Sequence, residues 1–226
     1  MKRLTPRRDI LPAPQLALWP ELEPMSRMGF VLYGGTALAL RLGHRQSVDF
    51  DFFSAGPLEQ RRVLGTTLLD EGQVIQDDPD TVTLIVRRAG GTVRVSFFGD
   101  LVPARIAGRV GEPEFTDDGM LLLASIDDLF ATKVKVVLDR AEAKGYRNIA
   151  ALLRSGASLE RALGAAQAIY GPAYQRTESI KALSYFADGD LATISREDQK
   201  LLTTAAAAVR TVPTISLASA ELALDS

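Results

Sequence analysis

Two aspartates, Asp49 and Asp51, are well suited by type and spacing to bind a divalent cation. They lie in residues 48–53, where charged and apolar side chains alternate, and this alternation predicts a β-strand. Successive side chains of a strand point to opposite faces, so we expect both carboxylates on one face and Val48, Phe50 and Phe52 on the other. Two adjacent anions repel each other, and a divalent cation such as Mg²⁺ would neutralise them.

A pair of glycines precedes the aspartates and suggests a phosphate site. Residues 30–33 are a short apolar run that predicts a strand, Gly34 and Gly35 end it, and residues 36–42 predict a helix of Ala and Leu. The first backbone N–H groups of a helix lack helical partners, so we expect this turn to hold an anion. Arg41 and Arg45 would add positive charge on one helical face if the helix continues through Gly43.

Together these features indicate phosphoryl or nucleotidyl transfer, in which glycines fix phosphates and aspartates hold Mg²⁺. Each feature alone has a simpler interpretation, because a glycine pair is usually a turn and an Asp-x-Asp on a strand is usually solvated surface. Their order favours a nucleotide site, since Asp51 lies within 17 residues of Gly35. His44 is an alternative general base, but a surface or hydrogen-bonding role is the simpler interpretation.

The composition excludes several other classes of site. There is no cysteine and one histidine, which excludes disulfides, thiolate zinc sites, cysteine nucleophiles and His-rich metal sites. Of the 226 residues, 46% are hydrophobic and 24% are charged, as in an ordinary soluble globular protein. The net charge of −2 gives no overall attraction for nucleic acid or anionic lipid. No apolar run predicts a membrane helix or a signal peptide, so we expect a cytoplasmic protein.

The remaining sequence predicts the elements that position these residues. Residues 73–76, 81–88 and 92–98 are rich in Val, Ile, Thr and Phe and predict strands, whereas residues 15–28 and 57–70 have helical spacing. Further helices are predicted over residues 126–140, 148–153, 159–168, 178–186 and 196–209. We therefore expect an α+β chain, with a mixed β-sheet and flanking helices in residues 1–124 and an α-helical domain in residues 125–226.

Several segments combine into a resemblance to a known family. The first reads Gly34-Gly-Thr-Ala-Leu-Ala-Leu-Arg41, followed by His44-Arg-Gln-Ser-Val-Asp-Phe-Asp-Phe-Phe-Ser54. Downstream are Asp128-Leu-Phe-Ala-Thr-Lys133 and Arg140-Ala-Glu-Ala-Lys144. Over residues 30–153 the sequence resembles the AbiEii/AbiGii toxin family of the DNA polymerase β-like nucleotidyltransferase superfamily. The resemblance implies a nucleotidyltransferase-like mixed sheet followed by a helical domain.

The resemblance also implies a function and a set of site residues. It implies Mg²⁺-dependent transfer of a nucleotide from an NTP to an acceptor, with RNA such as tRNA expected, by the toxin of a toxin–antitoxin or phage-defence pair. An antitoxin protein is then an expected partner. The expected catalytic residues are Asp49, Asp51 and Lys133, of which the aspartates hold the metal and Lys133 contacts the nucleotide phosphates. The expected nucleotide-binding residues are Gly34, Gly35, Thr36, Arg45, Ser47 and Lys133.

Two departures from the family pattern leave a second interpretation open. The third carboxylate of the superfamily comes from a neighbouring strand, where this chain has Ser96, with Asp100 four residues later. A serine hydroxyl is a weak metal ligand and a poor base. The family also commonly has acids where this chain has Gly145 and Asn148. The alternative is a catalytically degenerate nucleotide- or RNA-binding protein that retains the fold, and a structural or protein-interaction domain is a third interpretation.

Overall fold

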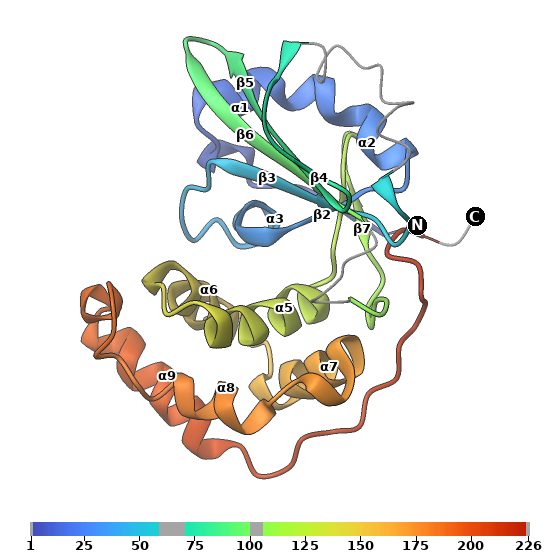
Figure 1. Ribbon diagram of the computed structural model, residues 1–226. Helices are drawn as coiled ribbons and strands as arrows, with labels where there is room; N and C mark the ends of the chain where they lie inside the picture. The colour runs from blue at the N-terminus through green and yellow to red at the C-terminus, as the bar shows by residue number, and fades with distance from the viewer. Residues whose placement is uncertain (1, 59–70, 100–105, 225–226) are drawn as a thin grey trace. The chain divides into compact units, whose positions relative to one another are not determined.

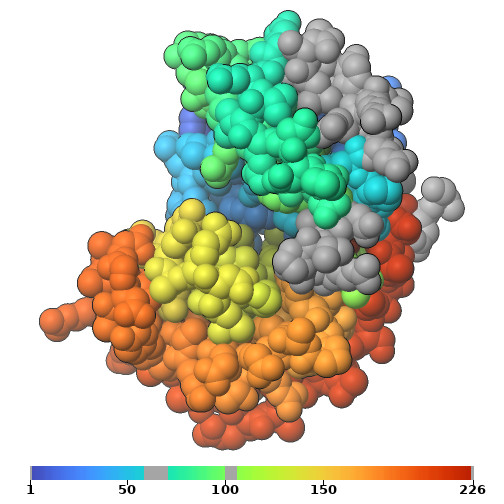
Figure 2. Space-filling model, viewed as in Figure 1, coloured from blue at the N-terminus to red at the C-terminus, as the bar shows by residue number. Residues whose placement is uncertain are grey.

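The computed structural model describes residues 2–58, 71–99 and 106–224 (Figure 1, and as a space-filling view in Figure 2). The chain divides into two compact units. The first comprises Met1–Gly108, Glu112–Ser125 and Ser219–Ser226, and the second comprises Arg109–Gly111 and Ile126–Ala218. Most of the helix predicted over residues 57–70, and Asp100, lie outside the described residues.

Within the described residues, the first unit contains an eight-stranded mixed sheet in the order β1-β7-β8-β2-β3-β6-β5-β4. β3 pairs antiparallel with β2 and parallel with β6, while β4, β5 and β6 form an antiparallel meander. This confirms the predicted mixed sheet. Its strands are β1 (Arg3–Leu4), β2 (Val31–Tyr33), β3 (Asp49–Phe53), β4 (Gln73–Asp78), β5 (Thr81–Arg88), β6 (Gly91–Phe98), β7 (Glu114–Thr116) and β8 (Leu122–Leu123).

Alternation along β3 separates its apolar side chains from its acidic ones. Phe50 and Phe52 are completely buried, whereas Asp49 and Asp51 keep part of their surface exposed. The two aspartates therefore lie on the opposite face of β3 from the buried aromatic rings. The prediction for Val48 was wrong, because the strand begins one residue later and Val48 is 57% exposed.

Helices flank both faces of this sheet. The N-terminal group consists of η1 (Arg8–Ile10), α1 (Ala13–Leu18), η2 (Trp19–Leu22) and α2 (Glu23–Arg27), where η denotes a 3-10 helix. Pro20 and Pro24 divide the segment predicted to be helical, because each is the second residue of a new short helix and lacks the N–H that would continue the previous one. α1 packs on β5 and β6, whereas α3 (Gly34–Leu42) packs on β2 and β3 and lies on the other side of the sheet in Figure 1.

Helix α3 ends at Leu42, one residue before Gly43. The sequence had left open whether the helix continues through that glycine. Gly43 has a φ of +62° and forms the left-handed C-cap of the helix. The helix therefore does not continue through Gly43, and Arg41 and Arg45 do not share a helical face.

Arg41 instead links α3 to β7 and to the end of β8. Its side chain is only 5% exposed and its Nη1 lies 2.5 Å from Glu114 Oε2. Its Nε donates to the Ala124 carbonyl oxygen at 2.9 Å and its Nη2 to that of Leu123 at 3.2 Å. These contacts use the guanidinium inside the first unit, so Arg41 has a structural role.

The second unit is helical, in agreement with the prediction from the sequence. α5 packs against α6, α7 and α8. Ser158 and Ser195 cap α7 and α9, because each hydroxyl accepts a backbone N–H three residues later at 3.1 Å. Its elements are α5 (Ile126–Asp139), α6 (Ala143–Arg154), α7 (Leu159–Tyr170), η4 (Gly171–Ala173), α8 (Arg176–Ala182), η5 (Leu191–Thr193) and α9 (Arg196–Ala208).

Two buried polar groups organise this unit. Asp128 is 1% exposed and accepts the backbone N–H groups of Val110 at 2.8 Å and Gly111 at 3.1 Å, which fastens that short segment to α5. The Tyr174 hydroxyl donates to Ser179 Oγ at 2.8 Å. Burial raises the pKa of Tyr174 to about 12.

Replacing Arg41 by alanine is expected to destabilise the protein by about 2–4 kcal/mol, because it removes the donor to Glu114 and to two carbonyl oxygens. Arg27→Ala is the matched control. Arg27 also pairs with a glutamate at 2.5 Å, but its side chain is 76% exposed, so its loss should cost about 0.5 kcal/mol or less. Urea unfolding of the full chain, followed by circular dichroism, measures both changes. Equal effects would contradict the structural role of Arg41.

Candidate active site

The first residue of α3 lies directly against the carboxylate of Asp51. Gly34 has a φ of +75°, a left-handed conformation that glycine adopts without strain. A Cβ atom built on Gly34 would overlap Asp51 Oδ2 and lie 3.1 Å from Asp51 Cγ. The preceding residue, Tyr33, pairs with Asp51 across β2 and β3, which sets this register. The missing side chain of Gly34 therefore provides the space that the Asp51 carboxylate occupies.

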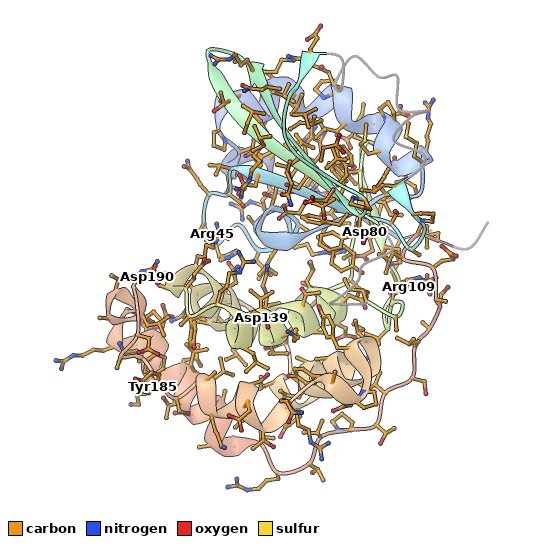
Figure 3. All side chains as sticks on the ribbon, viewed as in Figure 1. Arg45, Asp80, Arg109, Asp139, Tyr185 and Asp190 are labelled. Carbon is orange, nitrogen blue, oxygen red and sulfur yellow. The ribbon has the colours of Figure 1, made fainter. Side chains whose placement is uncertain are left out.

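The second glycine admits two side chains from the loop between α3 and β3. A Cβ atom on Gly35 would lie 2.6 Å from Arg45 Nη2 and 3.1 Å from Ser47 Oγ. Arg45 Nη1 donates to the carbonyl oxygen of Gln46 at 2.7 Å, which fixes the guanidinium in this loop (Figure 3). The two predicted nucleotide-binding residues Arg45 and Ser47 therefore lie beside the start of α3.

Thr36 connects the first turn of α3 to the start of β3. Its side chain is buried, and its Oγ1 lies 2.8 Å from Ser47 Oγ and hydrogen-bonds to the carbonyl oxygen of Asp49. Because the hydroxyl is used inside the fold, any phosphate contact of Thr36 would come from its backbone N–H. The first N–H groups of a helix are the ones that lack helical acceptors.

Asp49 forms an ion pair with a residue of the neighbouring strand. In the parallel pair of β3 and β6, Asp49 lies opposite Arg94 and Asp51 opposite Ser96. Arg94 Nη2 lies 2.5 Å from Asp49 Oδ2, and the two side chains are 48% and 31% exposed. Sequence reasoning missed Arg94. The sequence could have indicated Arg94, because it lies two residues before Ser96 and residues two apart on a strand share one face.

Ser96 lies where the third carboxylate was expected. Its side chain is 4% exposed, it lies opposite Asp51, and Thr83 of β5 donates to its Oγ at 3.2 Å. Thr83 is itself opposite Ser96 in the pairing of β5 with β6. A row of hydroxyl groups therefore continues from the acidic side of β3 across the sheet.

The donor atoms on this face fit a small, hard cation. Among the described residues, no group of three or more acidic, histidine or cysteine side chains could hold a metal ion alone. Mg²⁺ is commonly bound through only one or two carboxylates, with water and substrate phosphates as its other ligands. Asp49 and Asp51, which share one face of β3, supply that number of carboxylates.

The predicted residue Lys133 lies on α5 of the second unit, where it is only 9% exposed. The two positions at which the resemblance implies acids lie on α6. Asn148 is 2% exposed, and a Cβ atom on Gly145 would lie 3.4 Å from Val137 Cγ1. The neutral residues Asn148 and Gly145 thus stand at the two positions where carboxylates were expected.

The family model for the nucleotidyl transferase AbiEii toxin of type IV toxin–antitoxin systems matches residues 24–211. The chain belongs to the AbiEii family. The match includes β2, α3 and β3, which carry the site, and the helices of the second unit through α9. It confirms the resemblance drawn from the motifs. No curated protein matches the sequence.

The AbiEii family assignment agrees with a similarity in fold. The structure is similar to that of MenT4, a nucleotidyltransferase toxin from Mycobacterium tuberculosis H37Rv, with a TM-score of 0.58 and 15% sequence identity. The similarity covers 86% of this chain and 83% of MenT4. At this identity it shows the fold, and it confirms the predicted nucleotidyltransferase-like α+β class. None of the described helices of this AbiEii protein is long and apolar enough to span a membrane.

Replacing Gly34 by alanine is expected to displace the Asp51 carboxylate and to weaken Mn²⁺ binding at least about tenfold, as loss of support around a metal ligand commonly does. An alanine at this positive φ should also lower the free energy of unfolding by roughly 1–2 kcal/mol. Titration with Mn²⁺, monitored by electron paramagnetic resonance of the free ion, measures the binding.

Gly29→Ala separates these two effects. Gly29 has a φ of +79°, and no heavy atom of the described residues lies within 4 Å of an added Cβ. The Gly29→Ala variant should lose about as much thermal stability as Gly34→Ala does and should keep the Mn²⁺ affinity of the wild type. Equal Mn²⁺ affinities of the two variants would contradict the role assigned to the contact between Gly34 and Asp51.

Proposed function

We propose that this AbiEii protein is a Mg²⁺-dependent nucleotidyltransferase that transfers a nucleotide from an NTP to an RNA acceptor such as tRNA. One observation carries the proposal. Asp49 and Asp51 share one face of β3, and the Asp51 carboxylate lies against the glycine that begins α3. An acidic pair that can hold a cation is thereby adjacent to helical N–H groups that can hold phosphate.

In this proposal the first turn of α3 binds the triphosphate and β3 supplies the carboxylates. Gly34 and Gly35 present no side chains that would cover the backbone N–H groups of this turn. Mg²⁺ held by Asp49 and Asp51 would offset the negative charge that develops during in-line transfer. The protein residues then contribute mainly by positioning, which is the largest requirement of such a transfer.

We assign the cationic groups to the phosphates. Arg45 lies at the start of α3, next to Gly35, so its guanidinium is placed to add positive charge where the helix amides lie. Ser47 supports the same loop through Thr36. We assign Lys133 of α5 to the nucleotide phosphates on the strength of the family motif, and its low exposure of 9% agrees with a functional lysine that is kept from bulk water.

The biological role proposed is that of the toxin of a toxin–antitoxin or phage-defence pair. The AbiEii model is described as a toxin of a type IV system, and this description supports an antitoxin protein as the partner. RNA as the acceptor is part of the proposal, and the transfer of label from NTPs to total RNA tests it directly.

Incubating the full chain with labelled NTPs, Mg²⁺ and total RNA should transfer label to RNA. Asp51→Asn should reduce this transfer at least about a hundredfold, because metal stabilisation of phosphoryl transfer is worth several kcal/mol. Asp78→Asn is the matched control. Asp78 is an exposed aspartate on β4, in the same unit, and its replacement should leave transfer unchanged. No transfer with any NTP, with wild type and Asp51→Asn equally inactive, would contradict catalysis.

A binding-only protein is the second candidate, because Ser96, Gly145 and Asn148 stand where the resemblance to the family leads us to expect acids. Both candidates predict that Mg²⁺-NTP raises the melting temperature, since a ligand that binds only the folded state stabilises it. Only the transferase releases pyrophosphate and labels RNA. A thermal shift that Asp51→Asn abolishes, without label transfer, would favour the binding protein.

A further inference from the structure

The face of β3 and β6 that carries the proposed metal site is less acidic than a two-metal site requires. Two-metal sites hold their ions about 3.5–4 Å apart, and each ion needs anionic ligands. This face presents Asp49 and Asp51 from β3, with Arg94 and Ser96 opposite them on β6. Two carboxylates and one guanidinium give these four residues a net charge of −1.

The register of the sheet places the positive charge beside one of the two carboxylates. Arg94 lies opposite Asp49 in the parallel pair, and β5 pairs with β6 on its other side, so two strands hold the backbone of Arg94. Its Nη2 lies 2.5 Å from Asp49 Oδ2. A guanidinium stays charged at every physiological pH, so this cation is a permanent part of the face.

We propose that Arg94 is a built-in counter-ion of the metal site, that it takes the place of a second divalent cation beside Asp49, and that the site binds a single divalent cation. This inference rests on the proposed function, because it concerns the same carboxylates. A carboxylate has two oxygens and about four lone-pair positions. Asp49 can therefore share Oδ2 with Arg94 and offer Oδ1 to a cation that Asp51 also binds.

The rest of β6 agrees with a single cation. Ser96 presents a hydroxyl where a third carboxylate would stand, and Thr83 donates to that hydroxyl at 3.2 Å. β6 spans Gly91–Phe98 and contains no acidic residue within these described bounds. A second divalent cation would thus meet the Arg94 guanidinium and neutral oxygens on this strand, which do not compensate its charge.

An ordinary surface ion pair makes a different prediction. If the ion pair of Arg94 and Asp49 lay outside any cation site, its removal would leave cation binding unchanged. If Arg94 is the counter-ion, its guanidinium competes for Asp49 and repels the cation, so Arg94→Gln should tighten Mn²⁺ binding by roughly three- to tenfold. The stoichiometry should stay at one Mn²⁺ per chain, because the substitution adds no carboxylate.

The test is a Mn²⁺ titration of the full chain without nucleotide, monitored by electron paramagnetic resonance, which reports affinity and stoichiometry independently of turnover. Arg94→Lys keeps the charge and should stay within about twofold of wild type. Arg87→Gln is the matched control. Arg87 is exposed on β5, and its substitution removes one positive charge from the same unit. Its Mn²⁺ affinity should also stay within about twofold of wild type. Thermal melting confirms that each variant is folded.

The outcomes separate this inference from the proposed function. A single Mn²⁺ that is lost in Asp51→Asn and bound more tightly by Arg94→Gln supports both. Loss of Mn²⁺ in Asp51→Asn, with unchanged or weaker binding in Arg94→Gln, overturns only the counter-ion. Two Mn²⁺ per wild-type chain, both lost in Asp49→Asn, likewise overturn it. No Mn²⁺ binding, or binding that neither aspartate variant affects, overturns both proposals.

Discussion

The structure of the site depends on the contact between Gly34 and the Asp51 carboxylate. β2 ends at Tyr33, which pairs with Asp51, so the chain enters α3 immediately beside that carboxylate. A residue with a Cβ atom would overlap the carboxylate and would also be strained at a φ of +75°. Glycine at this position therefore determines where the helix starts, and it keeps the helix N–H groups close to the acidic face of β3.

The opposite face of β3 stabilises this arrangement through packing. Phe50 and Phe52 are fully buried, and Phe52 stacks with Phe97 of β6 with ring centroids 5.6 Å apart. A shift of β3 by one residue would exchange its aromatic and acidic faces, so burial of the rings strongly favours the observed register. The core thus determines which atoms face the candidate site, although none of the buried rings belongs to it.

The local parts of this site were predictable from sequence, and the parts that depend on strand pairing were not. Alternation placed Asp49 and Asp51 on one face, and the glycine pair indicated the start of α3. Arg94 lies 45 positions after Asp49 in the sequence, and the contact between them requires the parallel pairing of β3 with β6. Local periodicity carries no information on such pairing.

Arg41 shows that a residue assigned to the site from local spacing can instead have a structural role. Helical spacing suggested a phosphate ligand, but its partners on β7 and β8 became visible only with the complete sheet, and Gly43 ends the helix before Arg45. The second unit was easier to predict, because its helices depend on local periodicity and capping residues such as Ser195. Tertiary contacts therefore decide that Arg41 belongs to the internal structure of the first unit.

The charge of the face connects Arg94 and Ser96, the two features of β6 that depart from a two-metal site. With a guanidinium at one position and a hydroxyl at the other, the paired residues of β3 and β6 supply two carboxylates, both from β3. Under the proposed function, a triphosphate would supply oxygen ligands of its own, so a single cation held by the two aspartates would reach a full set of donors. Ser96 is then consistent with transfer, because in-line chemistry depends on positioning more than on a protein base. Under the counter-ion proposal, Arg94 balances the part of the Asp49 charge that this single cation does not neutralise.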